Sequence, residues 1–386
     1  MPQRIACFFS TSGHSGVDRF ARHLIPALAR RGYRVDLLKV RQHGPDLEGL
    51  PHGVQIIDLG TRHTYACLPE VLRYLRRSRP AVMLSDKDRV NRLALLARWL
   101  SRTGTRLVLR TGTTVSADLA SRGPLDRWAQ RRSIGWLYRF ADQVIVPSRG
   151  AADDMAAYTG LDRERIRAVP SPIVPASLLT ASLARPEHPW LGDPDHPLIL
   201  SVGELCSRKD FPTLIRAFAR VRARRASRLM ILGRGNARER LLALAETLGV
   251  AQDVDLPGFV AQPYAYMAHA SLLAFSSRWE GLPFVPVEAL AVGTPVVSTD
   301  CPSGPREILQ DGRIGRLVPV GDDAALADAI LATLEDPPAK ATLQDAARVF
   351  EIEASTNAYL DAMGLPHRAS APDGRRVAHA WPPRVR

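Results

Sequence analysis

The chain has 386 residues, 46% hydrophobic and 24% charged, which excludes a wholly disordered protein and allows two domains of ordinary size. Its net charge of +13 comes from 52 basic and 39 acidic residues, and nearly all of the basic residues are arginine. Arginine binds phosphates with two parallel hydrogen bonds, so nucleotides, nucleic acids and anionic lipids are all candidate partners. The four cysteines are scattered without metal-binding spacing, and no apolar run reaches the roughly 18 residues of a membrane span. These features predict a cytoplasmic protein.

Strand-like and helix-like segments alternate through the first half of the chain. Residues 4–10 are short and apolar, as in a buried parallel strand, and residues 17–31 have helical spacing and end before Gly32. Further strands are predicted at residues 34–40, 54–59, 81–85, 107–110 and 143–147, with helices at 68–77, 89–102 and 125–140. This alternation predicts an α/β domain with a doubly wound, mostly parallel sheet.

A proline-rich segment separates this half from a second, similar one. Seven prolines lie between residues 169 and 198, a density that predicts a linker without helix. The pattern resumes with strands at residues 198–202, 228–232, 254–256, 272–275 and 295–298, and helices at 211–224, 237–248 and 287–292. We therefore expect Rossmann-like domains at 1–175 and 197–345, joined by a linker at 176–196 and facing each other across a ligand-binding cleft. A helix at 346–365 should pack back on the first domain, and the tail at 366–386, rich in Pro, Arg and Ala, should be disordered.

Two glutamates flank a loop in the second half of the chain. Glu280 follows the strand at 272–275, and Glu288 is expected in the first turn of a helix that begins near Pro286. A carboxylate can accept two hydrogen bonds from a sugar or ribose diol, and the amides of a loop and helix start can bind a diphosphate. Taken alone, the pair is also compatible with a surface turn and a residue that favours the helix dipole.

The motifs around this pair carry a resemblance to a known family. Glu280 and Glu288 stand eight positions apart within the segment 277–291, followed by Pro-Val-Val-Ser at 295–298 and Cys-Pro-Ser-Gly-Pro-Arg-Glu-Ile-Leu at 301–309. Together these motifs resemble glycosyltransferase family 4, over roughly residues 4–362. The resemblance implies a GT-B architecture of two Rossmann-like domains. It also implies transfer from a nucleotide-sugar, here a UDP- or GDP-sugar, with retention of anomeric configuration and without a metal ion or other cofactor.

The resemblance also implies roles for residues of the second domain. Glu280 would hold hydroxyls of the donor sugar and Glu288 the ribose, while Arg208 and Lys209 would neutralise the departing diphosphate; we take these four as catalytic. The remaining donor-binding candidates are Gly203, Gly233, Arg234, Val260, Gly281, Leu282, Pro283 and Phe284. The family usually has Gly-Arg-Leu where this chain has Gly203, Glu204 and Leu205, so either Arg208 replaces that arginine or the donor site is altered.

The first domain offers candidates for acceptor binding and closure of the cleft. Gly13 and Gly16 form a glycine-containing loop ahead of a helix, which lets the backbone approach an anionic ligand, and Arg19 matches a basic position of the family. The family's histidine after the strand at 107–110 is missing, and Arg110 is the candidate in its neighbourhood.

Two further segments need an interpretation. Asp86-Lys87-Asp88 resembles a metal-binding Asp-x-Asp, but we interpret its aspartates as caps of the following helix. Residues 127–140 interleave arginines with aromatic residues, which is compatible with a helix lying on an anionic membrane surface or with an ordinary helix that buries Ile134, Leu137 and Phe140.

The sequence thus predicts a retaining, metal-independent glycosyltransferase that acts on a lipid-linked or polysaccharide- or lipopolysaccharide-type acceptor, in the cytoplasm or peripherally on the cytoplasmic face of a membrane. The alternatives are a sugar-nucleotide-binding protein with weak or no turnover, and a glycoside hydrolase that uses the two glutamates as acid and nucleophile. The basic composition would also suit a nucleic-acid-binding protein, but no known nucleic-acid motif occurs, so we expect no nucleic-acid partner.

Overall fold

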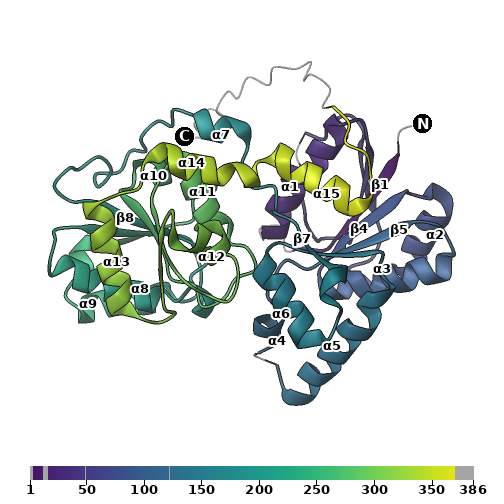
Figure 1. Ribbon diagram of the computed structural model, residues 1–386, viewed down its shortest axis with the longest axis horizontal. Helices are drawn as coiled ribbons and strands as arrows, with labels where there is room; N and C mark the ends of the chain where they lie inside the picture. Colours follow the sequence, from purple (N-terminus) through teal and green to yellow (C-terminus); the bar gives the residue numbers. More distant parts are fainter. Residues whose placement is uncertain (1–2, 12–15, 48, 121, 370–386) are drawn as a thin grey trace.

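The computed structural model describes residues 3–11, 16–47, 49–120 and 122–369. These residues form two α/β domains that lie side by side, each built on a parallel sheet with helices on both faces (Figure 1). The architecture agrees with the predicted pair of Rossmann-like domains.

The N-terminal sheet has seven parallel strands in the order β3-β2-β1-β4-β5-β6-β7. The strands are β1 Arg4–Phe9, β2 Arg34–Lys39, β3 Val54–Asp58, β4 Val82–Asp86, β5 Arg106–Arg110, β6 Gln143–Val146 and β7 Ile166–Ala168. Successive residues of β1 enter different cores: Cys7 and Phe9 lie in one cluster, and Ala6 and Phe8 in another. Both faces of the sheet are therefore buried, which explains why the strands are apolar almost throughout.

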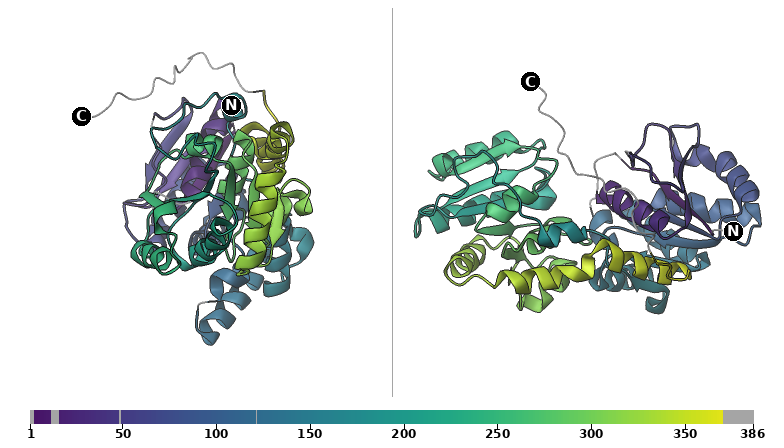
Figure 2. Two further views of the ribbon diagram at one scale, coloured as in Figure 1. Left: turned by 90° about the vertical axis from the view of Figure 1, so that its left-hand side faces the viewer. Right: turned by 90° about the horizontal axis from the view of Figure 1, so that it is seen from above.

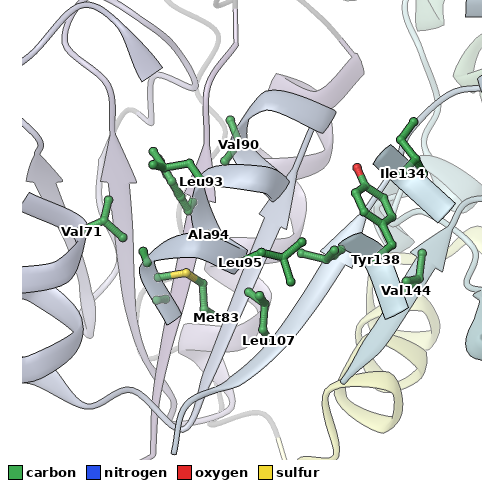
Figure 3. Packing of buried hydrophobic residues seen from close by; sticks show 14 of the residues in the cluster. Val71, Met83, Val90, Leu93, Ala94, Leu95, Leu107, Ile134, Tyr138 and Val144 are labelled. Atoms are coloured by element: carbon green, nitrogen blue, oxygen red, sulfur yellow. The ribbon is translucent and has the colours of Figure 1, made fainter. Parts of the chain in front are cut away.

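Helices cover both faces of this sheet. They are α1 Gly16–Arg30, α2 Leu68–Ser78, α3 Asp88–Ser101, α4 Val115–Leu119, α5 Pro124–Leu137 and α6 Arg149–Thr159. On one face, Leu93 and Ala94 of α3 pack close to Met83 and Leu107 of the sheet, with Tyr138 beside them (Figure 3). Helix α6 and strand β7 have no counterpart among the elements predicted above.

The C-terminal sheet has six parallel strands in the order β10-β9-β8-β11-β12-β13. The strands are β8 Leu198–Val202, β9 Arg228–Leu232, β10 Val254–Gly258, β11 Leu272–Phe275, β12 Val296–Thr299 and β13 Arg316–Val318. The helices of this domain are α8 Phe211–Arg222, α9 Arg238–Thr247, α10 Tyr264–His269, α11 Phe284–Val292, α12 Pro305–Ile308, α13 Asp323–Glu335 and α14 Lys340–Ala347. Two apolar clusters, one on each face, again bury the sheet.

The expectation that the proline-rich segment holds no helix is wrong. Helix α7, Ala176–Thr180, begins directly after Pro175, and its Leu178 is buried in the C-terminal domain. A proline just before the first turn costs no intrahelical hydrogen bond, so a short helix fits between the prolines.

The chain passes between the domains a second time near its end. After α14, helix α15 (Ile352–Met363) leaves the C-terminal domain, and its Tyr359 and Leu360 are buried in the N-terminal core (Figures 1 and 2). The two passages are hydrogen-bonded to each other: Ile173 and Val174 donate backbone N–H groups to the carbonyl of Phe350, and Ile352 donates to that of Val174. Both passages therefore lie at one place. The expected tail falls largely outside the described residues.

Candidate functional site

The two domains meet through loops that follow the carboxyl ends of their strands. Residues 112–114 and 148–150 follow β5 and β6, and they contact residues 280–283 and 302–307, which follow β11 and β12. Glu280 and Gly281, two of the predicted site residues, lie at this junction, the edge where open parallel sheets bind ligands.

Lys209 and Arg208 surround Glu280. They belong to a short 3-10 turn, Ser207–Lys209, after β8. Lys209 Nζ lies 2.8 Å from Glu280 Oε1, and Arg208 Nη1 lies 2.6 Å from Glu280 Oε2. Ser277 adds a hydroxyl donor 2.9 Å from Oε1. The predicted cations and the first predicted carboxylate thus form one cluster, in which Lys209 and Glu280 are each only 8% exposed.

This cluster sets the protonation state of Glu280. Burial favours the neutral acid, but the positive charges of Lys209 and Arg208, together with the hydrogen bonds that the carboxylate accepts, outweigh burial and hold its pKa below the ordinary value of 4.5. Glu280 is therefore ionised at neutral pH, and its single negative charge pairs with both cations, so the cluster keeps a net positive charge.

Glu288 is fully buried on α11. The prediction that it sits in the first helical turn is wrong, because α11 begins at Phe284 with Pro283 as its N-cap, so Glu288 lies in the second turn. Its Oε1 forms an ion pair with Arg19 of α1 and lies 3.5 Å from the hydroxyl of Tyr264, whereas Oε2 has no hydrogen-bond partner among the described residues. A buried carboxylate oxygen without a partner is costly, which marks it as a candidate ligand-binding atom.

Gly203 and Gly233 of the C-terminal domain lie close together, directly after β8 and β9. The backbone of Gly233, at φ +154°, lies directly against the carbonyl of Gly203, where a side chain would clash. A Cβ on Gly203 would lie 3.1 Å from the Lys209 side chain. Arg234 is exposed and stacks on Phe259, with its guanidinium carbon 5.0 Å from the ring centroid. Val260 packs at the margin of the C-terminal core.

The backbone of the loop at 280–284 is held by hydroxyl groups that the sequence analysis did not assign to the site. Thr114 donates to the carbonyl of Glu280, Ser148 donates to that of Gly281 at 2.9 Å, and Ser303 lies 2.8 and 2.7 Å from the two carbonyls. Ser148 follows the predicted strand at 143–147, where the resemblance has a common serine, but the partners of Thr114 and Ser148 lie more than 130 positions away and cannot be read from a local pattern. The side chains of Leu282 and Phe284 pack into hydrophobic clusters, so this loop can offer a ligand mainly its backbone.

The candidate acceptor-binding residues of the N-terminal domain have different structural environments. Gly13 lies outside the described residues, and Gly16 is the first residue of α1, with open space where a Cβ would be. Arg19 reaches across to Glu288, as described above. Arg110 is buried: it pairs with Asp86, donates to Tyr359 and Ser171, and lies over the ring of Phe20. It therefore ties the N-terminal sheet to α15 instead of facing an open acceptor site.

The capping interpretation of Asp86 and Asp88 is wrong. Lys87 is the N-cap residue of α3, without a side-chain cap, and Asp86 is the buried partner of Arg110. Asp88 instead pairs with Arg92 and accepts from Tyr138. Among the described residues, no group of three or more His, Cys, Asp or Glu side chains is arranged to hold a metal ion.

Helix α5 exposes apolar residues on its outer side. Ile134 is buried, but Leu125, Trp128 and Trp136 are 79%, 59% and 55% exposed. Phe140, which the alternative of an ordinary buried helix would place in the core, is 54% exposed and packs edge-on against Trp136. Trp99 on the neighbouring α3 is 74% exposed. In the part of the chain that the structure describes, no helix is long and apolar enough to cross a membrane.

A separate surface depression lies elsewhere in the C-terminal domain. It measures about 860 Å³ and lies between α12, α13 and β13, with Asp300, Arg306 and Asp328 in its lining. None of the predicted site residues lines it. The candidate site is therefore the domain junction, where the charged cluster and the unpartnered carboxylate oxygen are found.

Comparisons with known proteins agree with this architecture. Residues 15–172 match the family model "Glycosyl transferase 4-like domain", and residues 187–350 match "Glycosyl transferases group 1". The two models together cover most of both domains.

Two curated relatives illustrate the similarity. The N-acetylgalactosamine-N,N'-diacetylbacillosaminyl-diphospho-undecaprenol 4-alpha-N-acetylgalactosaminyltransferase of Campylobacter jejuni is 33% identical over 249 residues, which are 64% of this chain and 66% of that protein. The lipopolysaccharide core biosynthesis glycosyltransferase LpsE of Rhizobium meliloti is 28% identical over 353 residues, 89% of this chain and 94% of LpsE. The match to the first relative thus spans just under two thirds of its length.

Solved structures show the same fold. The lipopolysaccharide outer core galactosyltransferase WaaB in its apo form superposes with a TM-score of 0.73 at 17% identity, covering 94% of this chain and 99% of WaaB. Anabaena HepE in complex with UDP and glucose superposes with a TM-score of 0.76 at 18% identity, covering 93% of this chain and 99% of HepE. The motifs, the two domain models and the shared fold together lead to one conclusion: the chain belongs to the GT-B glycosyltransferases of the family 4 type.

Proposed function

We propose that this glycosyltransferase transfers a sugar from a nucleotide-sugar to a lipid-linked or lipopolysaccharide-type acceptor, with retention of anomeric configuration and without a metal ion. The observation that supports it most is the cluster of Arg208, Lys209 and Glu280, together with the buried carboxylate of Glu288.

The cluster contains the charges that the reaction needs. When the bond between the sugar and the diphosphate breaks, negative charge grows on the departing diphosphate, and fixed cations stabilise it. Lys209 and Arg208 are two such cations, and both are paired with the single carboxylate of Glu280, which leaves the cluster net positive. A donor whose diphosphate pairs with Lys209 and Arg208 would release the Glu280 carboxylate to accept hydrogen bonds from the sugar.

Glu288 supplies a second acceptor for the donor. Its Oε2 lacks a hydrogen-bond partner among the described residues, and a diol of the nucleotide or sugar would satisfy it. The structural relative HepE was solved with UDP, which supports a nucleotide-sugar as the donor class.

Two observations support the proposed class of acceptor: the names of two relatives, and the exposed aromatic surface of α5. The Campylobacter protein acts on an undecaprenol-linked sugar diphosphate by its name, and LpsE is named for lipopolysaccharide core synthesis. Acceptors of these kinds reside at membranes, and the exposed Trp128, Trp136 and Phe140 beside the arginines of α5 suit an anionic membrane surface.

The charges around Glu280 disfavour it as the acid of the alternative activity, a glycoside hydrolase. That reaction requires one carboxylic acid with a raised pKa to protonate the leaving group. The pKa of Glu280 is instead lowered, because Lys209 and Arg208 outweigh its burial.

A direct experiment tests the proposal. The purified chain is screened by thermal shift with UDP-, GDP- and ADP-sugars, where a ligand at 100 times its Kd should add about 2.7 kcal/mol of stability. The stabilising donor is then offered, with and without EDTA, to a polyprenyl-diphosphate-linked sugar, and NMR identifies the anomer of the product. Transfer with retention that persists in EDTA supports the proposal. Absence of transfer refutes the activity, an inverted product refutes retention, and loss of transfer in EDTA refutes metal independence.

A further inference from the structure

Three hydroxyl groups hold the consecutive carbonyls of Glu280 and Gly281, in the loop at 280–284 that we call the donor loop. Thr114 and Ser148 come from the N-terminal domain, and Ser303 comes from the C-terminal domain. Thr114 donates to the carbonyl of Glu280 and lies 2.9 Å from Ser303 Oγ. The Gly281 carbonyl accepts from Ser148 at 2.9 Å and lies 2.7 Å from Ser303 Oγ. The orientation of this short backbone segment therefore depends on both domains.

Fixing these carbonyls also fixes the N–H groups behind them. In a trans peptide the N–H of the next residue points opposite to the carbonyl. The bonds to Thr114 and Ser148 therefore direct the N–H groups of Gly281 and Leu282 away from the N-terminal hydroxyls. Those two amides directly follow Glu280, whose carboxylate forms ion pairs with Lys209 and Arg208.

The hydroxyls are placed for this contact and not for a local one. Thr114 immediately precedes α4, yet its side chain does not cap that helix and instead reaches the other domain. Ser148 does cap α6, accepting from the N–H of Ala151 at 3.2 Å, while its own proton is donated to Gly281. Each of the two hydroxyls thus donates its hydrogen bond to a backbone carbonyl of the loop at 280–284.

The contact exists only while the domains are together. A Cβ on Gly281 would clash with the carbonyl of Gly112, and a Cβ on Gly150 would lie 3.2 Å from the carbonyl of Pro302. Glu307 of α12 accepts the N–H groups of Arg149 and Gly150, both at 2.8 Å, at the start of α6. The carboxylate of one domain thus fastens the helix that carries Ser148 in the other.

From these contacts we infer that Thr114 and Ser148 are positioning residues, which turn the backbone amides of Gly281 and Leu282 toward the donor when the domains close. The inference rests on the proposed function in that it takes the ligand to be a nucleotide-sugar. Under it, the donor domain alone holds an incompletely oriented loop, and closure of the N-terminal domain completes the donor site. Neither hydroxyl needs to touch the substrate.

The test compares variants that differ by one hydroxyl. Thr114→Val and Ser148→Ala remove the donors, Thr114→Ser keeps one, and Ser116→Ala is the matched control, because Ser116 bonds to Asp154 within the N-terminal domain. Melting temperatures first establish that all four variants fold. Affinity for UDP is then measured by calorimetry, and kcat and KM are measured with the nucleotide-sugar that stabilises the parent most.

We expect Thr114→Val and Ser148→Ala to bind UDP nearly as the parent does but to lose about tenfold or more in kcat, as expected when reacting groups are misplaced. Thr114→Ser should recover most of this loss, and Ser116→Ala should match the parent. Parental kcat and KM in both deletion variants would overturn the inference, and so would a Thr114→Ser variant as slow as Thr114→Val.

A second measurement does not depend on turnover. Hydrogen exchange of the segment 279–285 should accelerate in Thr114→Val and Ser148→Ala and remain parental in Ser116→Ala. If the parent processes no nucleotide-sugar, the proposed function fails, while accelerated exchange still supports the positioning role. Unchanged exchange in both deletion variants refutes that role even if the parent is active.

Discussion

Arg19 on α1 and Glu288 on α11 form an ion pair that joins the two domains. Glu288 is fully buried, and Arg19 is also held over the ring of Phe284. We expect Arg19→Gln to leave an uncompensated buried carboxylate and so to favour separation of the domains. Small-angle scattering without ligand should then give a larger radius of gyration than the parent.

The control for this prediction is Arg220→Gln, which breaks an exposed pair with Asp323 inside the C-terminal domain. It should leave the radius unchanged. A parental radius in Arg19→Gln would show that the pair does not contribute to closure.

Lys209→Ala and Glu288→Ala should each lower transfer by about tenfold or more, because each removes a group proposed to bind the donor. Steady-state kinetics with the nucleotide-sugar, together with circular dichroism to check folding, measure the effect. Glu246→Ala, at an exposed position of α9, serves as the control. Full activity in both variants would remove these residues from the site.

Gly281→Ala tests the close approach of the domains. The added methyl group would clash with the carbonyl of Gly112 in the other domain, so the variant should stay partly open and turn over slowly. Gly104→Ala places a methyl group in open space and should behave as the parent does. The radius of gyration and the kcat of both variants are measured. Equal values in the two variants would mean that the contact between Gly281 and Gly112 accommodates the methyl group without a cost.

Stability should depend on the charge of Glu280 with a definite sign. Its pKa in the folded protein lies below the ordinary value of 4.5, so its stabilising contribution is complete above pH 4.5 and is lost as the pH falls through the folded-state pKa. Glu280→Gln should therefore lower the free energy of unfolding at neutral pH, on the order of 3 kcal/mol, because it leaves Lys209 buried without its counter-charge.

Denaturant unfolding of the parent and of Glu280→Gln between neutral and acidic pH measures this difference, which should shrink on acidification. Glu246→Gln is the surface control. A difference that grows as the pH falls would contradict the assigned sign.

The exposed aromatic side of α5 should govern attachment to membranes. Trp128→Ser combined with Trp136→Ser should reduce co-sedimentation with phosphatidylglycerol vesicles, because aromatic rings anchor at the headgroup level. Leu248→Ser combined with Val320→Ser removes exposed apolar groups from the other domain and should have no effect. Equal sedimentation of both double variants would exclude this surface as the attachment site.

Most of the fold could be predicted from the sequence because strands that are buried on both faces consist of short runs of apolar residues. Strands such as Leu198–Val202 and Arg228–Leu232 have the predicted bounds. The predicted start of α11 near Pro286 is too late, because Pro283 is the N-cap and Glu288 lies in the second turn. Local propensity cannot choose between two prolines that both suit a helix start.

The candidate site was predictable only in part. The motifs place Glu280, Arg208 and Lys209 at strand ends of one sheet, where parallel topology brings them together. The sequence could not reveal that Arg110 is used internally by Asp86 and Tyr359, since that network joins segments 24 and 249 positions apart. The contacts between domains likewise follow from their relative placement, which no local pattern encodes.

The two passages of the chain between the domains share one location, where Val174 and Ile352 are hydrogen-bonded. Two connections at a single point act as one hinge. The domains can therefore separate on the side away from Val174 and Ile352 while they stay together near these residues. Opening and closing should then follow a single arc, and the donor loop would return to the same hydroxyls on each cycle.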